Sequence, residues 1–222
     1  MRARKTRGFM ANIFTKDIVV LDVSSRLISA IVGVRKAQSV FCIKSVVEKE
    51  HSGYEQGEWF DADDTRSVAI SVLKEAMLNA ESRSKRIYIG VPAEFTTTIK
   101  KDVAITLDRE RRVIDADIDF LLKKGDTFDG SNFALINSTP ISFQVNTSDK
   151  LYRDARGLVA SKVVGNISYI LCEKSFIRFF DEIVASLGFK DVKYISTAWA
   201  EGITLFEKEE RDEPHMLVDI GY

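Results

Sequence analysis

Two apolar runs, one near each end of the chain, constrain the fold most because each leads directly into an acidic residue. The first run spans residues 18–21 and the second spans residues 217–218. Their β-forming side chains predict central strands that are covered on both faces. Carboxylates, hydroxyls and closely approaching backbone at a strand end suit a phosphate or a hydrated Mg²⁺ ion. The candidate phosphate-binding residues are therefore Asp22, Ser24, Ser25, Asp219 and Gly221.

The first part of the chain, residues 17–91, predicts three strands, a helix and a fourth strand. The apolar patterns place these strands at 18–23, 27–34, 40–46 and 86–91, and the helix from about 63 to 80. Asp63, Asp64 or Thr65 can cap the helix. This β-β-β-α-β order is typical of a ribonuclease-H-like layer, the half-unit of the actin fold.

The middle of the chain, residues 92–163, predicts a small α+β insertion. It contains an alternating strand at 96–107, a helix at 114–124 and two short strands at 133–136 and 141–145. We expect the first layer to resume over residues 164–222. The elements expected there are a strand at 163–172, a helix at 175–187 capped by Ser175, a strand at 191–195, a helix capped by Ser196 or Thr197, and a final strand that leads into Asp219. Residues 1–16 form a basic tail that we predict to be disordered.

Composition excludes several classes of protein. The net charge of −1 is against a general nucleic-acid binder, because no excess of cations exists to displace counterions. Cys42 and Cys172 lie in apolar runs and are predicted to be buried thiols, as in a reducing cytoplasm. His51 and His215 have no partners at metal-ligand spacing, so we expect no histidine metal site. The sequence contains neither a nucleophile elbow nor a Walker phosphate loop.

From about residue 17 onward, the chain resembles FtsA, the family of bacterial actin-like cell-division proteins. The similar segments follow the family's order and cover nearly the whole chain, although no single motif is highly specific. They are Val19–Ser25, Ile28–Gly33, Ser52-Gly53 with Gly57 and Asp61, Ile87–Val91, Thr139–Phe143, Gly157-Leu158, Leu187–Phe189, Trp199-Ala200 and Val218–Gly221.

The resemblance implies a scaffold at the cytoplasmic face of the membrane rather than an enzyme. In the family, ATP and Mg²⁺ bind between two halves of a clamp, and the insertion takes part in self-association and divisome contacts. Contacts with FtsZ and the membrane belong to the second half, so we expect this chain to be an N-terminal portion that does not turn over ATP. The implied phosphate-binding residues are the five candidates named above.

Two departures from the family pattern affect the phosphate loops. Ser24 stands where the family usually has glycine, and Tyr222 follows Gly221 where small or polar residues are usual. If position 24 requires a positive φ, a serine there costs roughly 1–2 kcal/mol. These departures bear directly on whether ATP binds.

Two other functions remain open. One is a role like that of PilM, the pilus-assembly actin-like protein, which has a similar insertion; the glycines at 53 and 57 favour FtsA over it modestly. The other is a degenerate member of the actin and sugar-kinase ATPase superfamily. An enzyme of that kind requires a catalytic carboxylate and a sugar pocket, and the sequence gives no signal for either.

Overall fold

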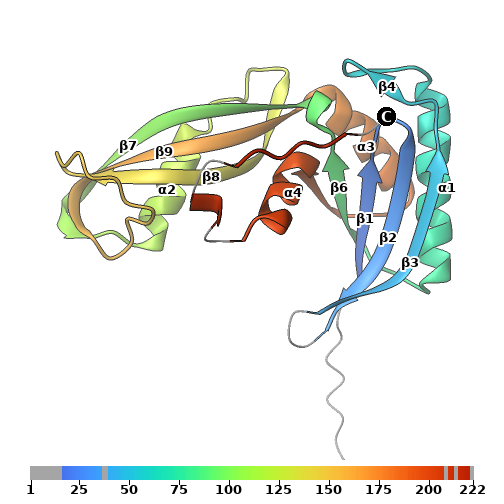
Figure 1. The fold of residues 1–222 in the computed structure, drawn as a ribbon, viewed down its shortest axis with the longest axis horizontal. Coiled ribbons are helices and arrows are strands. Elements are labelled where there is room, and N and C mark those ends of the chain that lie inside the picture. The colour runs from blue at the N-terminus through green and yellow to red at the C-terminus, as the bar shows by residue number, and fades with distance from the viewer. Residues whose placement is uncertain (1–16, 37–39, 208–209, 213–214, 221–222) are drawn as a thin grey trace, which may run out of the picture.

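The chain folds into two β-sheets that lie end to end, each with its own helices (Figure 1). This computed structural model describes residues 17–36, 40–207, 210–212 and 215–220. The predicted basic tail at 1–16 lies outside the described residues, as do Gly221 and Tyr222. Across the described ranges, no helix has the length and apolar character needed to cross a membrane.

The first sheet has five strands in the order β10-β6-β1-β2-β3. These strands are β1 (Asp17–Val23), β2 (Leu27–Arg35), β3 (Phe41–Glu50), β6 (Arg86–Val91) and β10 (Asp191–Ser196). The first three form an antiparallel meander, whereas β6 and β10 run parallel to β1. With α1 (Ala62–Asn79) between β3 and β6, the predicted β-β-β-α-β order is confirmed.

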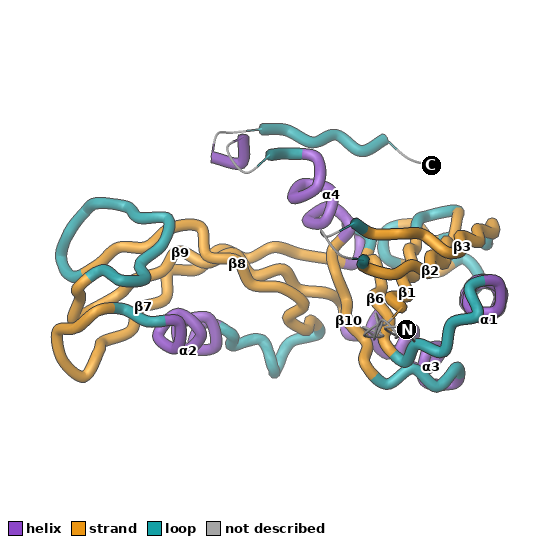
Figure 2. The backbone as a smooth tube through the Cα atoms, turned by 90° about the horizontal axis from the view of Figure 1, so that it is seen from below, coloured by secondary structure: helices purple, strands orange, loops and turns teal. Residues whose placement is uncertain are grey.

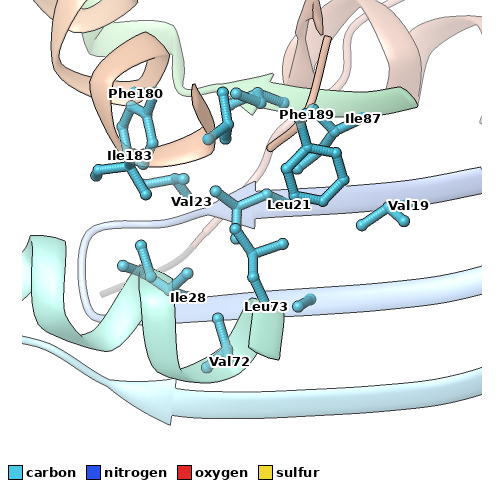
Figure 3. Close-up of a cluster of buried hydrophobic side chains, with 14 of the residues drawn as sticks. Val19, Leu21, Val23, Ile28, Val72, Leu73, Ile87, Phe180, Ile183 and Phe189 are labelled. Atoms are coloured by element: carbon cyan, nitrogen blue, oxygen red, sulfur yellow. The ribbon is translucent and has the colours of Figure 1, made fainter. Parts of the chain in front are cut away.

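Helices α1 and α3 (Lys174–Ser186) cover one face of the first sheet, and α4 (Thr197–Leu205) lies on the opposite side (Figure 2). Leu21 of β1 and Leu73 of α1 are fully buried and meet in the core with Phe180 of α3 (Figure 3). Along β1, Val19, Leu21 and Val23 are buried in this core and the residues between them are only partly buried, because successive side chains of a strand point to opposite faces. The expectation that both faces of this strand are covered is therefore met only in part.

The helix starts test the predicted caps. Helix α1 is capped by Asp61, whose carboxylate accepts hydrogen bonds from the N–H groups of Asp63 and Asp64, so the prediction of a cap at 63–65 is wrong by two residues or more. Helix α3 begins at Lys174 and has no side-chain cap, so the cap predicted at Ser175 is wrong. Ser196 does cap α4, accepting from Trp199 N–H at 3.4 Å.

The second sheet has three antiparallel strands in the order β7-β9-β8. Its elements are β7 (Thr96–Arg112), α2 (Asp115–Gly125), β8 (Phe133–Val145) and β9 (Val159–Glu173). Helix α2 packs on one face, where Leu121 meets Ile167 and Tyr169 in a separate core. The two short strands predicted at 133–136 and 141–145 are one strand, β8, with register irregularities at Leu135/Asn137 and Pro140/Ser142.

The strand expected to return the chain to the first sheet belongs instead to the second. Strand β9 forms where predicted, but it pairs with β7 and β8 from Val159 to Glu173. Its far end, Cys172, packs in the first core, so β9 spans both units. The boundary drawn at residue 163 therefore falls inside a strand, because apolar alternation is the same in either sheet.

The final strand predicted at 217–220 is not a strand in this structure. Residues 215–220 run outside both sheets, and Val218 and Ile220 are 65% and 90% exposed. Within the described part of the chain, no strand pairs with this segment. The smaller elements are the hairpin β4 (Tyr54–Glu55) and β5 (Glu58–Trp59) and the short helices η2 (Ala93–Phe95) and η3 (Glu210–Asp212).

Candidate functional site

The candidate site lies where the three parallel strands of the first sheet end. Strands β1, β6 and β10 run in one direction, so their carboxyl ends meet at one edge of the sheet. The residues there are Asp22 near the end of β1, Gly90 in β6 and Thr197 just after β10. Ligands of open α/β sheets bind at this edge, because the loops that follow the strands can diverge there.

The Asp22 carboxylate lies directly over the backbone of β6. A Cβ atom added at Gly90 would stand 2.7 Å from Asp22 Oδ1 and 3.1 Å from Thr197 Cγ2. Thr197 also donates its hydroxyl hydrogen to the carbonyl of Val91 at 3.3 Å. A glycine at position 90 is thus what allows Asp22 and the start of α4 to approach each other.

Three carboxylates are electrostatically coupled at this edge. Partial burial and the charge of Glu48 raise the pKa of Asp22 above its ordinary value, against a hydrogen bond from Val23 N–H. Partial burial also raises the pKa of Glu201 in α4, and the charges of Asp219 and Asp22 add to that effect. Asp22 and Asp219, from opposite ends of the chain, therefore share Glu201 as a neighbour.

Glu201 was missed in the sequence, although a signal for it existed. It stands four residues after Thr197, one turn further along α4, and so shares a helix face with the residue that lies beside Gly90. Gly90 was read only as part of a strand. Its role depends on the contact between β1 and β6, which the sequence alone does not reveal.

The loop after β1 is closed by the side chain of Ser24. The Ser24 N–H donates to Leu27 O at 2.9 Å, and the Leu27 N–H donates to Ser24 Oγ at 3.1 Å. The Ser24 hydroxyl is also directed at Leu27 O, at 3.1 Å. This hydroxyl therefore has a structural role, and a direct bond from it to a phosphate requires the loop to rearrange.

Ser24 does not have the positive φ that would strain a serine at this usually glycine position. Among the described residues, the non-glycine residues with positive φ are Gln56, Glu81 and Asn146. The conditional penalty for a serine at position 24 therefore does not apply. Ser25, the next residue, is half-buried and turns its carbonyl toward Gly53.

The site suits a cation better than a bare anion. Burial and the charges of Glu94 and Asp22 raise the pKa of the Tyr54 hydroxyl, which places further acidic groups nearby. Carboxylate oxygens are ligands that Mg²⁺ accepts, usually one or two of them together with water and substrate phosphates. The described residues hold no cluster of three or more His, Cys, Asp or Glu arranged to bind a metal ion directly. Asp22 supplies carboxylate oxygens of the type that Mg²⁺ accepts.

The candidate residues are thus brought together in part. Asp22 lies near the end of β1, and Ser24 and Ser25 lie in the loop that follows it. The charges of Asp22 and Asp219 both act on Glu201, and Gly221 lies outside the described residues. His51 is buried and hydrogen-bonded, and His215 lies against Phe206 with ring centroids 5.1 Å apart.

Comparison with known proteins shows the fold. No family model matches the chain, and no curated protein matches it. The structure is similar to a solved structure described as the "PilM-PilN type IV pilus biogenesis complex", with a TM-score of 0.51 and 9% identity over 85% of this chain and 49% of that chain. A second similar structure, from Bacteroides thetaiotaomicron, is a protein with an actin-like ATPase fold and unknown function; it has a TM-score of 0.30 and 12% identity, and the match covers 83% of this chain and 53% of that one.

This chain accordingly shares the fold of the PilM-PilN structure. It spans about half the length of the solved structures it matches. At 9% identity, this likeness shows the fold alone.

Proposed function

We propose that this chain belongs to an FtsA-like actin-fold protein of bacterial cell division that binds ATP with Mg²⁺ at the edge of the first sheet. The observation that carries the proposal is the close approach of the Asp22 carboxylate to Gly90, where the parallel strands β1, β6 and β10 end at one edge of the first sheet. The ordered resemblance to FtsA supplies the finer assignment.

Each residue of the site has a separate role in this proposal. Asp22 and Asp219 hold a hydrated Mg²⁺ ion through oxygen donors, and Gly90 keeps space for the Asp22 carboxylate. The Ser25 N–H orients the phosphates, the Ser24 hydroxyl reaches them only after the loop rearranges, and Gly221 extends the second loop. Burial and the charge of Glu48 raise the pKa of Asp22, and burial and the charges of Asp219 and Asp22 raise the pKa of Glu201. A bound cation relieves this repulsion.

The second sheet provides the surface for partners in this proposal. Strands β7 and β8 are its edges, and both are long, with 17 and 13 residues. Edge strands present rows of N–H and C=O groups that can pair with another chain. We therefore assign self-association and divisome contacts to this sheet. Contacts with FtsZ and with the inner face of the cell membrane are assigned to the full-length protein, which is cytoplasmic.

Calorimetric titration of the purified chain tests nucleotide binding. ATP with Mg²⁺ is expected to bind, ATP with EDTA to bind at least about tenfold more weakly, and Asp22→Ala to abolish the difference between them. Phosphate release is expected to stay at the background rate, since this is a scaffold rather than an enzyme. Equal affinity with and without Mg²⁺ would contradict the proposed site.

Depletion of the protein in its own cells tests the division role. Long, undivided filaments and a septal position of a fluorescent fusion are the expected results. Normal division with normal septa would overturn the assignment to FtsA.

The similarity to the PilM-PilN structure favours a second candidate, a PilM-like role in pilus assembly. This role predicts that depletion abolishes pili and leaves division intact. A degenerate member of the actin and sugar-kinase superfamily would give neither phenotype, and turnover of ATP with a small-molecule acceptor would favour that enzyme class instead.

A further inference from the structure

Residues 51–53 face the three consecutive carbonyls of the loop after β1. The Nε2 atom of His51 lies 2.9 Å from the Ser24 carbonyl oxygen, and the His51 N–H donates to Arg26 O at 3.0 Å. Between them, a Cβ added at Gly53 would stand 2.2 Å from Ser25 O. The carbonyls of residues 24–26 therefore all turn toward one segment.

This arrangement fixes the direction of the loop's amide groups. In a trans peptide the C=O and the following N–H point in opposite directions, and the structure contains no cis peptide among its described residues. The N–H groups of Ser25 and Arg26 consequently point away from residues 51–53. Successive N–H groups that point to one side form a concavity that suits an anion.

The partners of His51 determine its protonation. The Ser24 carbonyl can only accept, so Nε2 must carry a hydrogen. The Gly53 N–H can only donate and lies 3.2 Å from Nδ1, so Nδ1 must be the acceptor. Thr65 Oγ1, 3.0 Å from Nδ1, can donate to it or to Asp61 O. The ring is therefore neutral, and it is 8% exposed.

Ser24 adapts to this contact. In an ordinary tight turn the Leu27 N–H would bond to the carbonyl of residue 24. Here that N–H bonds to the Ser24 side chain instead, which leaves the carbonyl for His51. Ser24 and His51 thus form a matched pair, and a serine at this usually glycine position has a physical reason.

We propose that His51, neutral with its hydrogen on Nε2, is the positioning residue of the first phosphate loop. The inference deepens the proposed function and rests on it for its consequence in nucleotide binding. A proton on Nδ1 would face the hydrogen of the Gly53 N–H, and the hydrogen bond between Gly53 and the ring would break. The charged groups on the surrounding elements are Asp64 of α1, which is coupled to His51, and the Arg26–Glu50 ion pair beside the loop.

Two substitutions separate the contacts of the ring. In His51→Gln the terminal amide nitrogen reaches the place of Nε2 and can still donate to Ser24 O. In His51→Asn the shorter side chain can accept from Gly53 N–H but cannot reach Ser24. Both substitutions place a neutral amide at position 51, so the two variants are matched for polarity. They differ in whether the side chain can donate a hydrogen bond to the Ser24 carbonyl.

Nuclear magnetic resonance on the whole chain without nucleotide tests the positioning. The ring nitrogens of His51 should report the neutral Nε2–H tautomer at neutral pH. Protection of the Leu27 and Gly53 amides against hydrogen exchange, corrected for intrinsic exchange, should persist in His51→Gln at neutral pH. In His51→Asn, the Leu27 amide should lose this protection. In the wild type, both amides should lose their protection once His51 is protonated. A charged ring or an Nδ1–H tautomer at neutral pH, or equal protection in the two variants, would overturn the inference.

Titration with MgATP then tests the consequence. His51→Asn is expected to bind about tenfold more weakly than His51→Gln, because it removes the donor that holds the part-buried Ser24 carbonyl. If the wild type binds no MgATP, the proposed function fails, and the positioning by His51 is decided by amide protection alone. If both variants bind as the wild type does, His51 does not position the loop for phosphate.

Discussion

Replacing Gly53 by alanine is expected to destabilise the protein and displace the first phosphate loop. Gly53 has a φ of +86°, which costs an alanine roughly 1–2 kcal/mol. The added Cβ would also stand 2.2 Å from Ser25 O, whereas ordinary contacts begin at 3.4 Å. Because this oxygen belongs to the backbone, one segment must move by about 1 Å, and such overpacking costs roughly 1–3 kcal/mol. The total is about 2–5 kcal/mol.

Gly57→Ala is the matched control for this substitution. Gly57 has a similar φ of +80°, but its added Cβ would meet nothing closer than Glu173 Oε1 at 3.7 Å. It therefore carries the conformational cost of roughly 1–2 kcal/mol without the overlap. The change in unfolded-chain entropy is the same for both substitutions and cancels in their difference.

Urea unfolding of the two variants measures the overlap directly. Gly53→Ala should be less stable than Gly57→Ala by about 1–3 kcal/mol, or roughly 2–10 °C in melting temperature for a chain of this size. MgATP affinity should fall in Gly53→Ala and hold in Gly57→Ala. A difference in stability below about 0.5 kcal/mol would refute the close approach of residue 53 to the loop.

Three further substitutions have expected outcomes. Because burial raises the pKa of Asp22, the ionised carboxylate lowers the stability of the folded protein at neutral pH, and stability rises as pH falls through the folded pKa. Asp22→Asn should therefore unfold at an equal or higher urea concentration at pH 7 while losing Mg²⁺-dependent nucleotide binding. A variant that is less stable than the wild type would contradict this reasoning. Arg111 lowers the pKa of Asp117, which also accepts from Ile114 N–H, so this stabilisation is present above about pH 4 and is lost as pH falls through the folded pKa. Asp117→Asn should cost about 1–3 kcal/mol at pH 7, and the cost should shrink progressively as pH falls below about 4. A cost that does not change with pH would exclude the charge as its source. The ring of Phe176 is fully buried, and its centroid lies 4.8 Å from that of Phe95. Phe176→Ala should lower the free energy of unfolding in urea by about 3–5 kcal/mol. A decrease below about 1 kcal/mol would show that the rings of Phe95 and Phe176 are loosely packed.

Local patterns predicted most elements because each pattern has a direct physical cause. The apolar run at 18–21 forms strand β1, in which burial alternates because one side faces α1 and α3. Helix α4 is capped by Ser196, because that side chain accepts from Trp199 N–H. The same reasoning failed at α3, which starts without a side-chain cap. A serine near a helix start indicates only that a cap is possible.

Pairing between strands could not be predicted from these patterns. Strand β9 has the alternation of a half-buried strand, and either sheet would satisfy it. The segment 215–220 has the apolar residues of a strand, yet in this structure it has no neighbouring strand among the described residues. Periodicity identifies a strand, but it does not identify the partner.

The sequence by itself determined the actin-like order of elements and the loop that contains Asp22, Ser24 and Ser25, since both depend on neighbouring residues. Only the tertiary structure brought Glu201 and Gly90 to Asp22 and set His51 against Ser24. Those contacts join residues that are far apart in the chain, at distances fixed by how strands pair and helices pack. Electrostatic coupling and hydrogen bonding act over a few ångströms of space, whatever the separation along the chain.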